Sequence, residues 1–166
     1  MNFPYHSDGL TMLIPEAANL NTDGSASEIY NGLSKSFYGF IIPGTTTFAV
    51  FGSSAGVASS IGYKITQSDG NLCGGSCAYD ADDKYNYYWL FDVNDILNAS
   101  SVHAPRPYDY GKLSIPFDQN GKLSVIGGSY DPSNNTLYLS LENAGQVGTY
   151  DRPPLIIGYK IANEKL

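Results

Sequence analysis

The pentapeptide GSSAG at residues 52–56 has the spacing at which hydrolases present a nucleophilic serine. In those enzymes the motif lies between a strand and a helix, and here Ser54, Asp92 or Asp95, and His103 would supply the triad in order. The residues after Gly56 are β-branched and typical of a strand instead. An internal repeat described below also lacks a serine at the matching place. We therefore expect GSSAG to be the end of a strand.

Acidic residues gather further along, at Asp80, Asp82 and Asp83, and further oxygen ligands follow at Asn86, Asp92, Asn94 and Asp95. Carboxylates are the hard oxygen ligands that calcium prefers, so the first three residues predict a Ca2+ site. Their spacing does not fit an EF-hand loop. The alternative is a solvated acidic loop, with Asn94 or Asp95 capping a following helical turn. A glycosidase would need two carboxylates facing each other across a cleft, and the sequence does not place them.

Cys73 and Cys77 are the only cysteines, and they flank Gly-Gly-Ser. This spacing predicts a disulfide that closes a small loop, which suits an oxidising compartment. Half of a metal site is the rival interpretation, but no second Cys/His pair completes it. Two free thiols are the remaining alternative.

Four consecutive or nearly consecutive aromatic residues predict a binding surface: Tyr85, Tyr87, Tyr88 and Trp89. Alternate residues of a strand share a face, so Tyr85, Tyr87 and Trp89 would line one side and Tyr88 the other. One row is expected to be core. The other is a potential platform on which a sugar ring or a partner protein stacks.

Runs rich in aromatic and β-branched residues predict the elements that position these side chains. The predicted strands are residues 36–42, 46–51, 60–66, 87–93, 112–116, 122–130, 136–141 and 155–162. Pro43-Gly44 and residues 131–135 predict the turns of two hairpins. Residues 94–98 predict a single helical turn, and residues 67–84 a polar, Gly-rich loop.

Two segments of the chain each have a second copy, one of them similar and the other identical. TFAVFGSSAG at residues 47–56 resembles TLYLSLENAG at residues 136–145, and IGYKI occurs at residues 61–65 and 157–161. Repeated antiparallel units that are too small to fold alone are typical of sheets arranged radially.

The repeat predicts an all-β fold in which residues 1–166 form a single unit of antiparallel β-sheet blades, part of a β-propeller. The blade-like repeats cover about residues 36–117 and 122–162, and the first carries residues 67–84 as an inserted loop. Another register aligns the last strand with residues 87–95. A β-sandwich with a repeated hairpin is the alternative fold.

Residues 85–96, 106–117, 126–141 and 153–161, in this order, resemble the C-terminal part of a family of uncharacterised, secreted, bacterial β-propeller-like proteins. The resemblance covers about residues 36–162 and rests on strands and turns. It implies a propeller-like fold that further blades complete. The family has no assigned activity, so the resemblance assigns no functional residues.

The composition and charge exclude some classes of function. Of 166 residues, 15% are charged and 13% aromatic, and the formal charge is −7, which disfavours nucleic acid. No apolar run is long enough for a membrane span. The N-terminus does not read as a signal peptide, so we expect a segment of a longer protein that is secreted, extracellular or periplasmic.

These observations predict a binding or structural module, a scaffold for protein assembly or for attachment to a surface or carbohydrate. The alternative is a fragment of a carbohydrate-active hydrolase or lyase whose site is completed by missing blades. Open sheet edges of a partial propeller would pair with other strands, so we expect self-association or a second protein chain.

Overall fold

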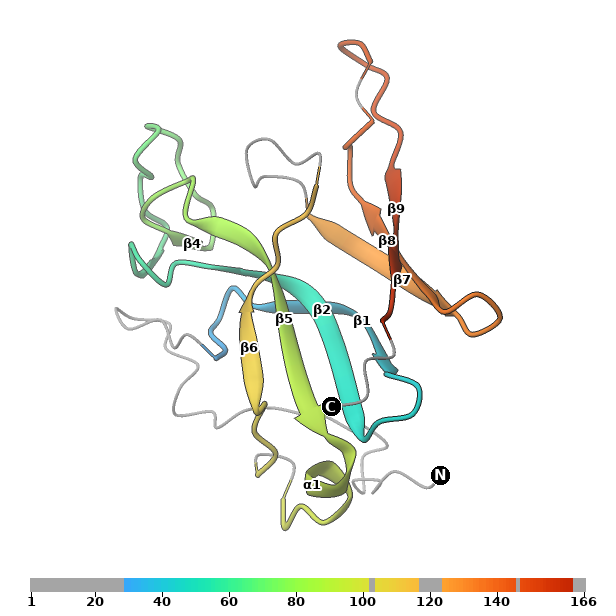
Figure 1. Cartoon of the computed structure of the whole chain (residues 1–166). Coiled ribbons are helices and arrows are strands. Elements are labelled where there is room, and N and C mark those ends of the chain that lie inside the picture. The colour runs from blue at the N-terminus through green and yellow to red at the C-terminus, as the bar shows by residue number, and fades with distance from the viewer. Residues whose placement is uncertain (1–28, 102–103, 117–123, 146, 163–166) are drawn as a thin grey trace, which may run out of the picture.

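The described part of the chain folds into three antiparallel sheets and one short helix (Figure 1). The structure is a computed structural model that describes residues 29–101, 104–116, 124–145 and 147–162. In chain order the elements are β1 (Lys35–Ile41), β2 (Thr47–Ala55), β3 (Ile61–Tyr63), β4 (Ser76–Ala78), β5 (Lys84–Asp92), α1 (Val93–Leu97), β6 (Asp109–Lys112), β7 (Val125–Asp131), β8 (Thr136–Leu141) and β9 (Leu155–Lys160). The predicted all-β class is confirmed. The described residues form no closed barrel or propeller.

The largest sheet has the strand order β1-β2-β5-β6. The predicted turn at Pro43-Gly44 connects β1 to β2, and Gly44 has φ +77°, which glycine adopts without steric cost. After β5 the chain makes the predicted helical turn. The Asp92 side chain caps it by accepting a hydrogen bond from the Asn94 N–H at 2.8 Å. The expectation that Asn94 or Asp95 caps this turn is therefore wrong by two or three residues.

A three-stranded sheet, β7-β8-β9, packs on one face of the four-stranded sheet. β7 lies against β1, where the rings of Phe40 and Tyr130 stack with centroids 4.8 Å apart. Beside them the Tyr38 ring lies so close to Gly128 that any side chain there would collide with it. The buried residues of this cluster are all aliphatic, and are Ile115, Val125, Leu137, Leu139, Leu141 and Ile157.

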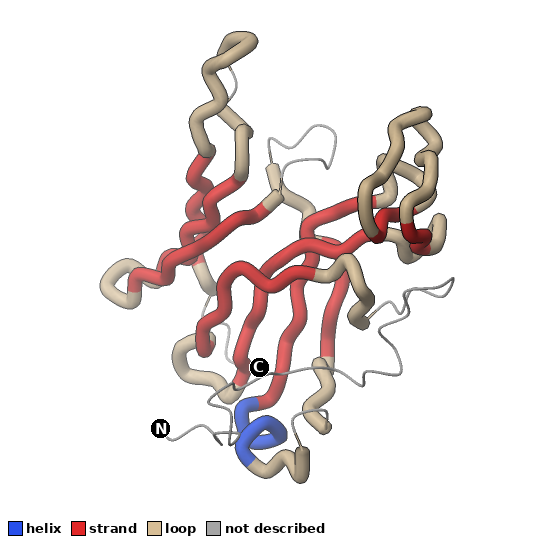
Figure 2. Tube along the Cα trace, turned by 180° about the vertical axis from the view of Figure 1, so that it is seen from behind, coloured by secondary structure: helices blue, strands red, loops and turns tan. Residues whose placement is uncertain are grey.

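The opposite face of the four-stranded sheet carries an aromatic cluster. Tyr87, Trp89 and Phe91 alternate along β5 and are buried together with Ile96 of α1. The chain before β1 covers them, because the Trp89 Nε1–H donates to the Ile29 carbonyl and the Tyr30 ring lies 5.2 Å from the Trp89 ring. Figure 2 shows this sheet from behind.

The short strands β3 and β4 form a separate two-stranded sheet at one end of the molecule (Figure 1). The predicted strand at residues 60–66 is wrong beyond Tyr63, because Lys64 adopts φ +53° and turns the chain out of the sheet. The predicted loop at residues 67–84 is also more structured than expected. It contains β4, which pairs with β3, and its last residue begins β5.

The strand predicted at residues 112–116 is displaced. β6 pairs with residues 87–90 of β5 and ends at Lys112. Beyond it, the Leu113 N–H still donates to the Asn86 carbonyl, and Ile115 is then buried in the aliphatic cluster between the sheets. The chain therefore leaves one sheet for the other in this segment.

The two predicted repeats supply different sheets. The described part of residues 36–117 builds the four-stranded and two-stranded sheets, and that of residues 122–162 builds the three-stranded sheet. β2 and β8 are both central strands that follow a hairpin turn. The two copies of IGYKI, in contrast, begin β3 and fall within β9, in different sheets.

Candidate binding pocket

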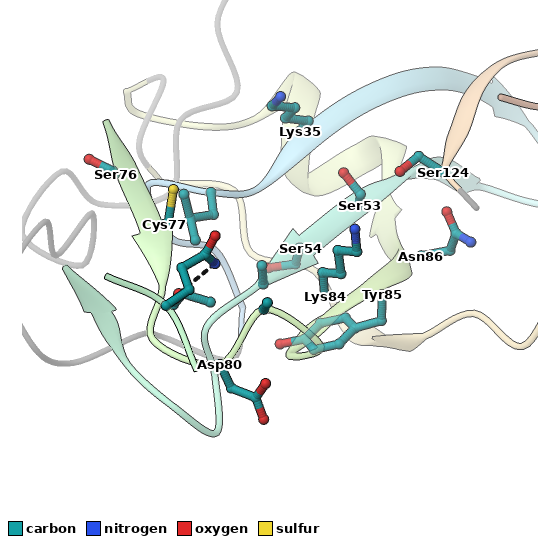
Figure 3. A pocket seen from close by; sticks show the side chains of 15 residues that line it. Lys35, Ser53, Ser54, Ser76, Cys77, Asp80, Lys84, Tyr85, Asn86 and Ser124 are labelled. Carbon is teal, nitrogen blue, oxygen red and sulfur yellow. Dashed lines mark hydrogen bonds between the residues drawn. The ribbon is translucent and has the colours of Figure 1, made fainter. Parts of the chain in front are cut away.

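A pocket of about 230 Å³ lies where the four-stranded sheet meets the β3–β4 sheet (Figure 3). The first residues of β1 and β5 and the last residues of β2 form one side of it. β4 and Asp80 form the other side, and Ser124, directly before β7, completes the lining. Three sheets therefore contribute to one concave site.

Strand register explains why polar side chains gather here. Lys35 is paired with Ser53, and Ser53 is paired with Asn86, so these three residues form a row across β1, β2 and β5. Lys84, two residues before Asn86 and opposite Ala55, points to the same face. Further along this face Phe51 packs on the second sheet, so the polar row begins where that cover ends.

Asn86 holds the floor of the pocket in place. It is only 4% exposed, and its Oδ1 accepts a hydrogen bond from the Val125 N–H at 2.8 Å. Its backbone carbonyl accepts another from the Leu113 N–H at 2.8 Å. Because one residue binds the chain on both sides of the passage between the sheets, the pocket floor is fixed to both layers.

The charge at the pocket is mainly positive. Lys35 and Lys84 line it, and neither forms a salt bridge with another residue in the described part of the chain. A third lysine, Lys112, lies over the ring of Tyr85 with its Nζ 4.1 Å from the ring centroid. Among the described lining residues, Asp80 is the only acidic one.

The predicted acidic residues serve the surrounding loops. Asp80 Oδ1 accepts hydrogen bonds from the Ser68 hydroxyl and the Asp82 N–H. Asp83 Oδ2 accepts from the Ser59 N–H at 2.8 Å, the Ser59 hydroxyl and the Ala58 N–H, which ties the start of β5 to the link between β2 and β3. No three metal-ligating side chains come together within the described ranges. Calcium at Asp80, Asp82 and Asp83 stays a prediction.

The four predicted aromatic residues do not share one surface. Tyr87 and Trp89 are buried in the aromatic cluster, 5% and 1% exposed, and Tyr85 borders the pocket. Tyr88 lies on the other face, its ring against Gly111 and its hydroxyl donating to Asp109 at 3.3 Å. Burial and the Asp109 carboxylate raise the pKa of Tyr88 above its ordinary value.

The predicted disulfide between Cys73 and Cys77 is present, with the two Cα atoms 6.4 Å apart. Cys77 belongs to β4 and lines the pocket. The backbone of the bridged loop is also held, because the Cys73 N–H donates to the Ile65 carbonyl and the Lys64 N–H donates to the Gly75 carbonyl. The disulfide therefore stiffens one wall of the pocket.

The GSSAG segment lies at the end of β2, as expected. Ser54 is 3% exposed, and its Oγ lies 2.9 Å from the Ser34 Oγ. A nucleophile would need a base at that position. His103 lies outside the described residues. Asp80 is the one carboxylate in the part of the lining that the structure describes, and a glycosidase uses two.

Sequence reasoning missed Lys35, Ser53 and Ser124, and it considered Asn86 only as an oxygen ligand for calcium. Asn86 had a detectable signal, since it is a polar residue in an otherwise aromatic strand. The two lysines carry no such signal in the sequence. Lys35 and Lys84 are separated by 48 intervening residues, and only the β1-β2-β5 strand order brings them to one face of the sheet.

Comparison of the chain with protein-family models, curated proteins and solved structures finds no match. Within the described residues, no helix has the length and apolar character needed to cross a membrane.

Proposed function

We propose that this protein is a non-catalytic, extracytoplasmic binding module that holds a hydroxyl-bearing ligand, such as one residue of a carbohydrate, in the pocket. The observation that carries the proposal is the lining itself, which combines serine hydroxyls and lysine ammonium groups in one concave site. Such convergent polar groups around a partly apolar wall are typical of small-molecule sites.

The size of the pocket suits a small group. Its volume of about 230 Å³ is below the range of about 300–1,000 Å³ that takes drug-sized ligands. One sugar residue, at the end or side of a longer chain, fits this scale. The pocket is partly open to solvent, which leaves a path for the rest of such a chain.

The lining offers groups that a sugar uses. Ser53, Ser76 and Ser124 place hydroxyls at the pocket, and these can donate to or accept from ring hydroxyls. Tyr85 borders the pocket, but its side chain points to the face of the aromatic cluster, where Lys112 Nζ lies over its ring. The Asn86 hydrogen bonds and the disulfide pre-organise this lining, which lowers the entropy lost on binding.

The disulfide also supports the proposed location. Disulfides persist in secreted and periplasmic proteins and are rare in the cytosol, where thiols are kept reduced. A surface-attachment role outside the cell agrees with that chemistry.

We further propose that the module belongs to a larger assembly, either blades of a β-propeller or copies that pair at their sheet edges. β6 and β9 are edge strands among the described residues, and Ile156 on β9 is 63% exposed. Such edges pair with other strands unless they are protected. Size exclusion with light scattering tests this proposal: a multiple of 17.9 kDa supports assembly, and a stable monomer favours a closed β-sandwich.

Binding to a glycan array, followed by calorimetry on the best ligand, tests the carbohydrate proposal. Ser53→Tyr places a ring in the pocket and is expected to abolish binding. Ser129→Tyr is the matched control, because Ser129 is exposed on β7 in the other sheet. Equal binding by both variants would remove the pocket from the proposal, and turnover of the glycan would favour the hydrolase or lyase alternative.

A further inference from the structure

We infer that the ligand is anionic, a sugar that carries an acidic substituent held between Lys35 and Lys84. This inference rests on the proposed binding function and deepens it. It is carried by the strand register, which places Lys35 beside Ser53 at one end of the polar row and Lys84 two residues along β5 from Asn86 at the other end.

The register places both ammonium groups within reach of one ligand. Lys35 and Asn86 are two strands apart, so their Cα atoms are separated by about 10 Å, at about 4.8 Å for each neighbouring strand. Lys84 lies two residues along β5 from that row. Both side chains are long and flexible, and both line the pocket. An acidic group over Ser53 can therefore be approached from two sides.

The local charge runs against that of the whole chain. The formal charge is −7, yet both ammonium groups at this site lack a carboxylate partner among the described residues. The nearby acids are engaged elsewhere, Asp80 by Ser68 and Asp83 by Ser59. Two like charges facing one small pocket repel each other, and an anion between them removes that repulsion.

Two kinds of side chain recognise different parts of the ligand, the lysines its acidic substituent and the serines its sugar ring. A lysine acts as a point charge and does not select between a carboxylate and a phosphate by shape. The serine hydroxyls recognise the sugar to which that group is attached. The common chemistry of the ligand is thus a hydroxylated ring with one negative substituent.

The experiment is a set of NMR titrations of the whole chain with matched monosaccharides. The probes are glucuronate against glucose, galacturonate against galactose, and glucose 6-phosphate as the phosphate arm. We expect each acid to bind about tenfold more tightly than its neutral partner, the gain of a charge-assisted hydrogen bond. Raising the salt concentration should reduce that advantage because the pocket is open to solvent. The carboxylate and phosphate arms show which anion is preferred.

Variants assign the effect to the lysines. Lys84→Gln is expected to lower the affinity for the acidic sugar about tenfold and leave the neutral sugar unchanged, and Lys35→Gln to lower it about threefold. Lys84→Arg should retain the preference for acids. Lys160→Gln, on β9 in the other sheet, is the control and should change nothing.

The outcomes separate the two proposals. Equal binding of acidic and neutral sugars, or an acid preference that survives Lys84→Gln and Lys35→Gln together, overturns the anionic ligand and leaves the binding module. Binding of none of the five sugars overturns the carbohydrate function, and the anionic ligand with it. Chemical shifts of the variants in the absence of sugar verify that each is folded.

Discussion

The same five residues, Ile-Gly-Tyr-Lys-Ile, form two different structures in this molecule. In residues 61–65 the strand ends after Tyr63, and Lys64 turns the chain with φ +53°. In residues 157–161 the segment runs on within β9, as far as Lys160, in extended conformation. Identical local preferences therefore produce a three-residue strand in one place and part of a six-residue strand in the other.

The partner strand makes the difference. The first copy pairs only with Ser76–Ala78, and its Tyr63 is 62% exposed. The second pairs with β8 along its whole length, so that Ile157 packs in the aliphatic cluster and the Tyr159 hydroxyl is buried. Where a long partner and an apolar face are available, the pentapeptide extends. Where the long partner strand and the apolar face are absent, as at residues 61–65, hydrogen bonds to the disulfide-bridged loop stabilise the pentapeptide instead.

Truncating the first isoleucine of each IGYKI copy should give the largest change in the free energy of unfolding. Ile157→Ala is expected to lower the free energy of unfolding by about 3 kcal/mol, because a cavity opens in the aliphatic cluster. Ile61 is more buried than Ile157 but lies outside both large clusters, so Ile61→Ala is expected to lower the free energy of unfolding by about 2 kcal/mol. Urea unfolding measures both, and hydrogen exchange should show that the Ile61→Ala effect is concentrated in β3 and β4.

Removing the disulfide should weaken one copy only. With Cys73→Ser and Cys77→Ser together, closing the five-residue loop no longer limits the unfolded chain, a loss of about 2 kcal/mol. Amide exchange should accelerate in β3 and β4 and remain unchanged in β9. Equal acceleration in both places would contradict the view that the two copies are stabilised separately.

The glycines of the two copies should tolerate a methyl group differently. At Gly62 a Cβ would lie 2.6 Å from Ile65 Cγ2, so Gly62→Ala is expected to destabilise by about 1–2 kcal/mol. At Gly158 the nearest atom is Tyr138 Cε1 at 3.3 Å, which needs only a small shift. Gly158→Ala should stay within about 0.5 kcal/mol of the original protein, because reduced freedom of the unfolded chain offsets the contact. Thermal unfolding of the pair gives the comparison.

Replacing the tyrosine of each IGYKI copy by phenylalanine should change the free energy of unfolding least, and the change should depend on pH. The Tyr159 hydroxyl is buried and has no hydrogen-bond partner among the described residues, so Tyr159→Phe is expected to raise the free energy of unfolding by up to about 1 kcal/mol. Burial raises the pKa of Tyr159 above its ordinary value of about 10. In the unfolded chain this phenol ionises at a lower pH than in the folded chain.

The stability contributed by that pKa difference is complete below the ordinary value and is lost as the pH rises above it. The original protein should therefore lose stability faster than Tyr159→Phe in alkaline solution. Tyr63→Phe, on the exposed tyrosine of the first copy, is the control and should change stability at no pH. Unfolding curves at neutral and alkaline pH measure the difference.

Features set by neighbouring residues could be predicted from the sequence. The Pro43-Gly44 hairpin, the helical turn after β5 and the disulfide across four residues each depend on local geometry, and each is present. The aromatic row of β5 was also predictable, since Tyr87 and Trp89 alternate with polar or half-buried positions.

Features set by distant residues could not be predicted. The end of β3 depends on how short its partner is, and the partner strand arises within what reads as a loop. The pocket depends on the row formed by Lys35, Ser53 and Asn86, which exists only once β1, β2 and β5 are neighbours. Buried asparagine in an aromatic strand signals a special role, but its partner Val125 is 39 residues away.

The hydrogen bond from Val125 to Asn86 has a consequence for the order in which the protein forms. A ribosome releases residues 35–112 first, and these contain all four strands of the large sheet. Until Val125 emerges, the amide of Asn86 lacks that donor, and the face that carries Phe51 has no second sheet to cover it. A nascent chain stopped in this interval exposes an apolar surface, and chaperones bind such surfaces. The emergence of Val125 thus marks the point in synthesis after which the two layers can close on each other.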